Sequence, residues 1–282
     1  MLTRFLVLAI ALTLHPASVY AEKAPRGYEH LMSPHKHAFS YSRPGEPVRR
    51  GQRSERFELR NGDCRGSDCK NDRLRSEIRE PKRKSSARIN KDVWYGWSFL
   101  VAKSPNNPGR DGRLYPFFGQ WKTGPDNSPT ISFTQSDHGS RDVVFVSLGD
   151  MSRHGNGSVA GHKHGNVCKG IFSIASAKRG WIDIVMNTNF ATNSAGYLRV
   201  WVNGQLKCNY KGQIVANKPS SGYSGPNHRR GIYVGNTKRW KTKYGNAPVP
   251  TWIVFYDEFL VGRSREEVDT RLRENAGLPP KD

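Results

Sequence analysis

The segment RLRSEIR, at residues 73–79, can form a surface that binds an anion, because its charged side chains occupy alternate positions. Successive side chains of an extended chain point to opposite faces, so Leu74 and Ile78 would turn toward a core. The opposite face would carry Arg73, Arg75, Glu77 and Arg79. Three guanidinium groups beside one carboxylate suit a ligand that carries several negative charges.

Two further segments add groups that can bind a substrate or move a proton. In FGQWK, Gln120 and Lys122 share one face, and in RRGIYV the same alternation puts Arg229 and Tyr233 together. If the three polar faces meet on one concave sheet, they line a cationic groove that contains a tyrosine and a glutamine. The alternative is three ordinary strands with solvated outer faces, which antiparallel sheets often have.

Alternation with period two dominates the chain and predicts a largely β structure. The longest such pattern is VWYGWSFLV at residues 93–101, where every second side chain is apolar or aromatic. The pair Asn203-Gly204, between YLRVWV and QLKCNY, is typical of a two-residue hairpin turn. Further strands are expected at residues 130–135, 143–148, 170–175, 181–186, 197–202 and 251–261.

Only the C-terminal region has a helical pattern. Ser264 and Glu267 match a capping box, Val268 and Leu272 would share one face, and Gly277 would end the helix. Many short strands followed by one helix predict an all-β fold. We expect a concanavalin-like, two-sheet antiparallel β-sandwich or jelly roll with a short C-terminal helix.

Residues 1–21 have the three-part pattern of a secretory signal peptide. Arg4 precedes the apolar run FLVLAIALTL, and small residues lead to a cleavage site near Ala21. The run is too short to span a bilayer, although a short membrane anchor is the alternative. We expect a secreted or periplasmic protein with an irregular basic arm at residues 22–50. Residues 51–282 would form a single domain, since no linker or repeat divides them.

The four cysteines predict two disulfides, because an even number in an exported chain usually forms bridges. Cys64 and Cys69 enclose the short loop CRGSDC, which leaves Cys168 to pair with Cys208. A zinc site is the alternative, since two histidines precede Cys168, but the spacing matches no common zinc pattern.

The formal net charge of +21 points to a polyanionic partner. The signal-peptide pattern argues against nucleic acid as the partner and favours an acidic polysaccharide. We expect the protein to be a monomer. A solvated basic surface without a specific partner is the alternative.

The motifs RSEIRE, FGQWK and RRGIY, in that order, resemble the three active-site strands of the jelly-roll polysaccharide lyases. The heparin-lyase-I-like family is the most similar, and alginate and glucuronan lyases are more distantly similar. The stretches GWIDIVMNTNFATNSAGYLRVWVNG and YDEFLVG also resemble strands of this family, so the resemblance covers most of residues 53–262. It implies β-elimination on a uronic-acid polymer, in which the C5 proton beside a carboxylate is removed and the 4-linked sugar leaves.

The resemblance also implies a role for each residue of the groove. Arg75 and Gln120 match residues that neutralise the carboxylate and stabilise the enolate-like intermediate. Tyr233 matches the residue that removes the C5 proton, protonates the leaving oxygen, or both, and neighbouring cations would favour its phenolate. The remaining groups, Arg73, Arg79, Arg229 and Glu77, are assigned to substrate binding, with Glu77 orienting an arginine.

Lys122 departs from the family pattern, which usually has Gln-x-His where this chain has Gln120-Trp121-Lys122. The lysine could hold the carboxylate or act as the base. Alternatively, a histidine could reach the groove from a loop, and the candidates are His138, His154, His162 and His164, the last three in a glycine-rich stretch that could form a lid. The departure could also mark a relative that binds without catalysis.

Two other functions remain open. A lectin-like module would bind acidic polysaccharide on the same fold without cleaving it. A retaining glycoside hydrolase needs two carboxylates about 5–5.5 Å apart, but Asp257 and Glu258 are adjacent and would face opposite ways. We expect no required cofactor, although the resemblance allows a structural calcium ion with Asp257 as a conceivable ligand.

Overall fold

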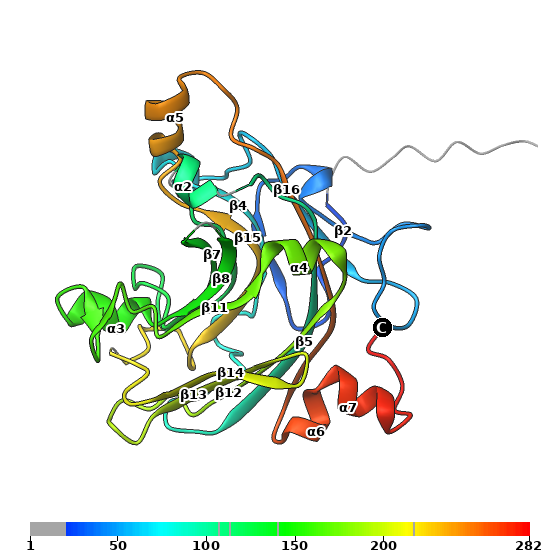
Figure 1. Ribbon diagram of the computed structural model, residues 1–282, viewed down its shortest axis with the longest axis vertical. Coiled ribbons are helices and arrows are strands. Elements are labelled where there is room, and N and C mark those ends of the chain that lie inside the picture. Colours follow the sequence, from blue (N-terminus) through cyan, green and yellow to red (C-terminus); the bar gives the residue numbers. More distant parts are fainter. Residues whose placement is uncertain (1–20, 107, 113, 140, 217) are drawn as a thin grey trace, which may run out of the picture.

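Two seven-stranded sheets, here named sheet A and sheet B, form the two main layers of the molecule (Figure 1). The structure is a computed structural model that describes residues 21–106, 108–112, 114–139, 141–216 and 218–282. The predicted signal peptide lies outside the described residues, except for Ala21. The predicted two-sheet antiparallel sandwich is confirmed.

All neighbouring strands within the two sheets pair antiparallel. In spatial order, sheet A contains β1 (Glu29–Met32), β4 (Leu74–Arg79), β15 (Asn227–Val234), β6 (Phe117–Lys122), β7 (Ile131–His138), β8 (Arg141–Ser147) and β11 (Cys168–Ser173). Sheet B contains β14 (Gln205–Lys211), β13 (Tyr197–Val202), β12 (Ile182–Thr188), β5 (Val93–Lys103), β16 (Trp252–Gly262), β3 (Glu55–Leu59) and β2 (Phe39–Tyr41).

The facing sides of the sheets form the core. The alternate side chains of β5 that were predicted to share one face are all buried, namely Val93, Tyr95, Trp97, Phe99 and Val101. Trp97 meets Phe133 of β7 edge to face, with ring centroids 5.2 Å apart, and so joins the two sheets. Burial of each large apolar side chain contributes about 1.5–3 kcal/mol, so this face of β5 helps to hold the two sheets together.

The hairpin turn and the strands agree closely with the sequence patterns. β13 ends at Val202 and β14 begins at Gln205, and both turn residues have positive φ angles, 49° at Asn203 and 82° at Gly204. The strand expected at residues 170–175 ends earlier, because Ser173 caps the helix α4 (Ile174–Arg179) by accepting a hydrogen bond from the Ser176 amide at 3.0 Å.

Residues 22–50 are not an irregular arm throughout, which corrects the prediction. Within this segment, β1 adds to the edge of sheet A, the short 3-10 helix η1 (Lys36–Ala38) follows, and β2 adds to the edge of sheet B. Phe39 is fully buried. Strands of three or four residues are too short for alternation to reveal them.

The C-terminal helix is two short helices, α6 (Arg265–Val268) and α7 (Thr270–Asn275), rather than one. Asp269 separates them and caps α7 by accepting a hydrogen bond from the Arg271 amide at 3.1 Å. Glu267 accepts from the Arg263 amide, not from Ser264, so the expected capping box is absent. Leu272 is 37% exposed, so it does not share the buried environment of Val268.

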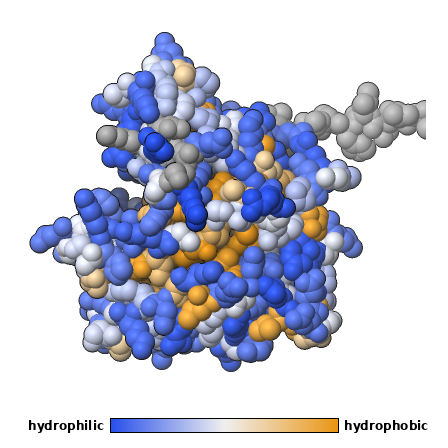
Figure 2. Space-filling view, viewed as in Figure 1, coloured by the Kyte–Doolittle hydropathy of each residue, from blue (hydrophilic) through white to orange (hydrophobic). Residues whose placement is uncertain are grey.

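Both predicted disulfides are present. The Cys64–Cys69 bridge closes a loop that contains α1 (Ser67–Lys70), and the Cys168–Cys208 bridge joins β11 to β14. Among the described residues, none of the helices has both the length and the apolar character needed to span a bilayer. The face seen in Figure 2 is largely hydrophilic, with hydrophobic residues gathered in its middle.

Candidate active site

The pairing of three central strands of sheet A brings the three predicted polar segments together. β15 lies between β4 and β6, so Tyr233 pairs with Arg75 on one side and Arg229 pairs with Gln120 on the other. Trp121 and Ile232 are fully buried behind these residues. The expected alternation therefore holds on all three strands.

These strands form the floor of a groove of about 960 Å³. The groove lies between α5 (Lys238–Tyr244) and α3 (Gly149–His154), which contribute Arg239 and Arg153 to its lining, and Figure 2 shows an indentation between them on its left side. Its charged lining, within the described part of the chain, is nine basic residues against two acidic ones. The basic residues are Arg65, Arg73, Arg75, Arg79, Lys82, Lys122, Arg153, Arg229 and Arg239, and the acidic ones are Asp68 and Asp126.

A network of buried hydrogen bonds occupies the centre of the floor. The carboxylate of Asp68 accepts from Nε and one terminal nitrogen of Arg75, at 2.7 and 3.0 Å. Glu77 accepts from the other terminal nitrogen of Arg75 and from the amide of Gln120, both at 2.6 Å. All three guanidinium nitrogens of Arg75 are thus engaged by carboxylates of the protein.

Arg75 also determines the surroundings of Tyr233. Its guanidinium carbon lies 4.3 Å from the centroid of the Tyr233 ring, a cation–π contact. Burial raises the pKa of Tyr233, and the nearby charge of Arg75 opposes this only in part. The Tyr233 phenol is therefore protonated at neutral pH and is suited to donate a proton.

The pKa of Lys122 bears directly on the chemistry that the groove can perform. Burial, the neighbouring Arg229 and Arg75 together lower the pKa of Lys122 to about 7. Its ammonium group donates a hydrogen bond to the carbonyl oxygen of Pro125 at 3.0 Å. Near neutral pH a substantial fraction of Lys122 is the free amine, which can accept a proton.

Comparison with known proteins assigns this chain to a family. Residues 26–260 match the family described as polysaccharide lyase. The chain belongs to the polysaccharide lyase family. None of the curated proteins matches it in sequence.

Among solved structures, a glucuronan lyase shares the fold, and two alginate lyases are similar at lower scores. An endo-β-1,4-glucuronan lyase from the fungus Trichoderma reesei is 14% identical with a TM-score of 0.54, over 88% of this chain and 92% of that one. The alginate lyase A1-II′ is 13% identical with a TM-score of 0.47, over 80% and 82% of the two chains. An alginate lyase from Pseudomonas aeruginosa is 15% identical with a TM-score of 0.45, over 75% and 83%.

Alternation did not identify Asp68 as a part of the site of this polysaccharide lyase. Asp68 lies in α1, inside the Cys64–Cys69 loop, and reaches Arg75 seven residues along the chain. The one feature of the sequence that pointed to Asp68 was the loop CRGSDC, in which a disulfide would hold an acidic residue close to a basic strand.

The histidines that were expected as candidates do not line the groove of the lyase, as far as its described residues show. His162 belongs to a small hairpin of β9 (Ser158–Val159) and β10 (His162–Lys163), and the groove lining includes none of His138, His154, His162 and His164. Of the histidines that the structure describes, only His30, at the edge strand β1, lines the groove.

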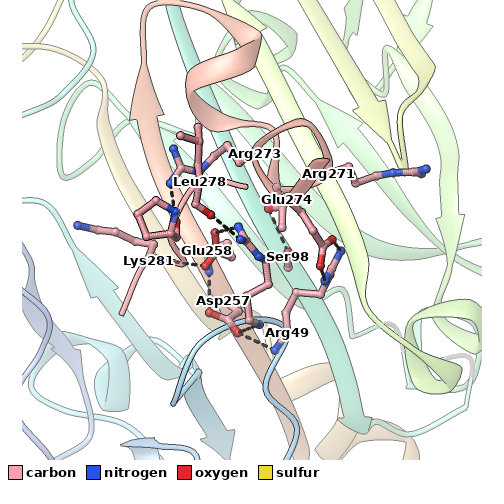
Figure 3. Close-up of polar contacts among 12 residues, drawn as sticks. Arg49, Ser98, Asp257, Glu258, Arg271, Arg273, Glu274, Leu278 and Lys281 are labelled. Atoms are coloured by element: carbon pink, nitrogen blue, oxygen red, sulfur yellow. Dashed lines mark hydrogen bonds and ion pairs between the residues drawn. The ribbon is translucent and has the colours of Figure 1, made fainter. Parts of the chain in front are cut away.

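The carboxylates Asp257 and Glu258 lie outside the groove lining and bind the segment at residues 49–50 (Figure 3). Asp257 accepts from the backbone amides of Arg49 and Arg50 at 2.7 and 3.2 Å, and Glu258 pairs with the Arg50 guanidinium at 3.2 Å. Glu258 has a positive φ of 52°, within an irregularity of β16, so the two carboxylates do not separate to opposite faces as expected. They cannot act on a substrate in the groove as a glycosidase pair.

The same contacts do not fit a calcium ion. The oxygens of Asp257 are taken by three backbone amides, including that of Glu258 at 2.8 Å, and an arginine already neutralises Glu258. Among the described residues, no cluster of three or more His, Cys, Asp or Glu side chains is arranged to hold a metal. Cys168 cannot be a zinc ligand as the alternative required, because its sulfur forms a disulfide with Cys208.

Proposed function

We propose that this polysaccharide lyase is secreted and cleaves a uronic-acid polymer by β-elimination. The observation that carries the proposal is the meeting of Gln120, Lys122 and Tyr233 on the floor of one strongly basic groove. A uronate polymer presents a carboxylate on each uronic acid, and a basic groove attracts such a chain. The two disulfides and the signal-peptide pattern support an oxidising compartment outside the cytoplasm.

The protonation states of the two titrating groups suggest complementary roles. The free amine of Lys122 would take the C5 proton, and the electron pair of that C–H bond would form the C4–C5 double bond. The bond from C4 to the bridging oxygen would break, and the phenol of Tyr233 would give its proton to the leaving oxygen. Proton exchange with solvent would then restore both groups.

Gln120 and Arg75 would support these steps from fixed positions. Gln120 gives one amide hydrogen to Glu77, which leaves its second hydrogen for the substrate. Arg75 would act mainly by holding the Tyr233 ring, since its own nitrogens are occupied. Glu77 would orient Arg75, the role expected from the sequence, and would also orient Gln120, since it accepts hydrogen bonds from both.

The test is incubation of the purified protein with a panel of uronate polymers, sulfated and unsulfated, while the ultraviolet absorbance of unsaturated ends is followed. We expect absorbance to rise with at least one uronate polymer and not with a neutral glucan.

A lectin-like module is the second candidate, because Lys122 stands where the resembling lyases have a histidine. Tight binding of one uronate polymer without any release of unsaturated ends would establish this function and reject the proposed elimination.

A further inference from the structure

Within the described part of the chain, one buried cation of the groove makes no hydrogen bond or ion pair. Three arginines are buried among the described residues, and two of them are neutralised by carboxylates. Arg75 is bonded to Asp68 and Glu77, and Arg230 is bonded to Glu55 at 2.6 and 2.5 Å. The third is Arg229.

Arg229 is only 5% exposed, yet its guanidinium makes no hydrogen bond or ion pair within the described part of the chain. Its Nε is fully shielded from solvent and unbonded. Glu77 attracts it electrostatically, but Glu77 is already bonded to Arg75 and Gln120. Burial lowers the pKa of Arg229, which means that its buried surroundings disfavour this charge.

An uncompensated buried guanidinium is costly, so such a group is expected where a ligand supplies the missing anion. Arg229 lines the groove and pairs across the sheet with Gln120, and its charge depresses the pKa of Lys122. An anion bound to Arg229 would therefore lie beside the residues proposed to do the chemistry. A carboxylate fits the planar fork of a guanidinium through two parallel hydrogen bonds.

We infer that Arg229, rather than Arg75, binds the carboxylate of the uronic acid whose C5 proton is removed. The inference rests on the proposed function for the nature of the anion. Arg229 completes its hydrogen bonds only when substrate is bound, whereas Arg75 keeps the same carboxylate partners throughout. The neighbouring Arg230 points to the opposite side of the sheet and takes no part.

The experiment measures binding of glucuronate monosaccharide, which has no glycosidic bond to cleave, by calorimetry and by the shift of the melting temperature at fixed ionic strength. Wild type should be stabilised by glucuronate and not by glucose. Arg229→Gln should weaken binding about tenfold or more, as expected for loss of a charged hydrogen-bonding group. Without ligand, Arg229→Gln should melt no lower than wild type, because the variant removes an unpaired charge.

Two matched variants complete the test. Arg230→Gln breaks the pair with Glu55, so it should melt lower than wild type and still bind glucuronate. Arg75→Gln should also retain binding. The inference is overturned if wild type does not bind glucuronate, if Arg229→Gln binds as well as wild type, or if folded Arg75→Gln loses binding. Glucuronate binding that depends on Arg229, in a protein that cleaves no uronate polymer, would reject the elimination but keep the anion site.

Discussion

The guanidinium carbon of Arg75 lies 4.3 Å from the centroid of the Tyr233 ring, and the same guanidinium donates two hydrogen bonds to Asp68 of the Cys64–Cys69 loop. A side chain in a disulfide-closed loop is thereby linked, through one arginine, to the proposed proton donor. This connection would give the loop a part in the proposed chemistry, although the loop does not belong to the strands of the floor.

Tyr233→Phe should reduce turnover by roughly 10²–10⁴-fold, since it removes the proposed proton donor and keeps the ring on which Arg75 stacks. Binding of uronate polymer and the melting temperature should stay close to wild type. Steady-state rates, calorimetric binding and thermal unfolding provide the three measurements. Full activity in this variant would show that another group moves the proton.

The lowered pKa of Lys122 predicts that turnover increases as pH rises through about 7, because the amine must lose its proton to act as the base. Lys122→Arg retains a positive charge but cannot lose its proton near neutrality, so turnover should collapse. If Lys122→Arg instead keeps most of the turnover, the lysine serves to hold an anion and the base lies elsewhere.

The same pKa shift has a consequence for folding stability. In the folded protein Lys122 binds its proton less tightly than in the unfolded chain, where the pKa is near 10.5. Between about pH 7 and pH 10.5 the unfolded state therefore binds more protons, so this residue adds stability as pH rises through that window. Lys122→Met should flatten this part of the curve of unfolding free energy against pH, measured by denaturant titration.

Asp68→Asn should lower kcat more than it raises KM, because Arg75 would lose a charged partner and hold Tyr233 less firmly. The melting temperature should also fall, as is usual when one partner of a buried ion pair is removed. Asp72→Asn is the matched control, since Asp72 is a half-buried residue of the same region whose carboxylate makes a long 3.7 Å contact with Lys241. If kcat and KM were the same in the two variants, Asp68 would have no role in the site.

Polymer binding should weaken steeply with salt, since the groove is lined by nine basic residues and exposed charges are screened within about 8 Å at physiological ionic strength. A neutral glucan should not compete. Affinity that is unchanged between low and moderate salt would indicate recognition by stacking instead of charge.

The floor of the groove was predictable because alternation is a local property of the chain. Gln120 and Tyr233 could be assigned to one face from their own strands, and antiparallel pairing then brought them together. Asp68 could not be predicted, since the position of a loop side chain depends on contacts with strands distant from it. Nor could one predict that Arg229 makes no ion pair with any described residue, because that depends on where every neighbouring carboxylate points.

The Cys168–Cys208 bridge has a consequence for self-association. β11 and β14 are the outermost strands of sheets A and B on the same side of the sandwich, and the bridge fastens one to the other. An outermost strand has backbone amides and carbonyls with no neighbour on one side, which can template pairing with another molecule. Fastening the two edges restricts their outward movement, so reduction of this bridge should promote intermolecular strand pairing before it disturbs the groove.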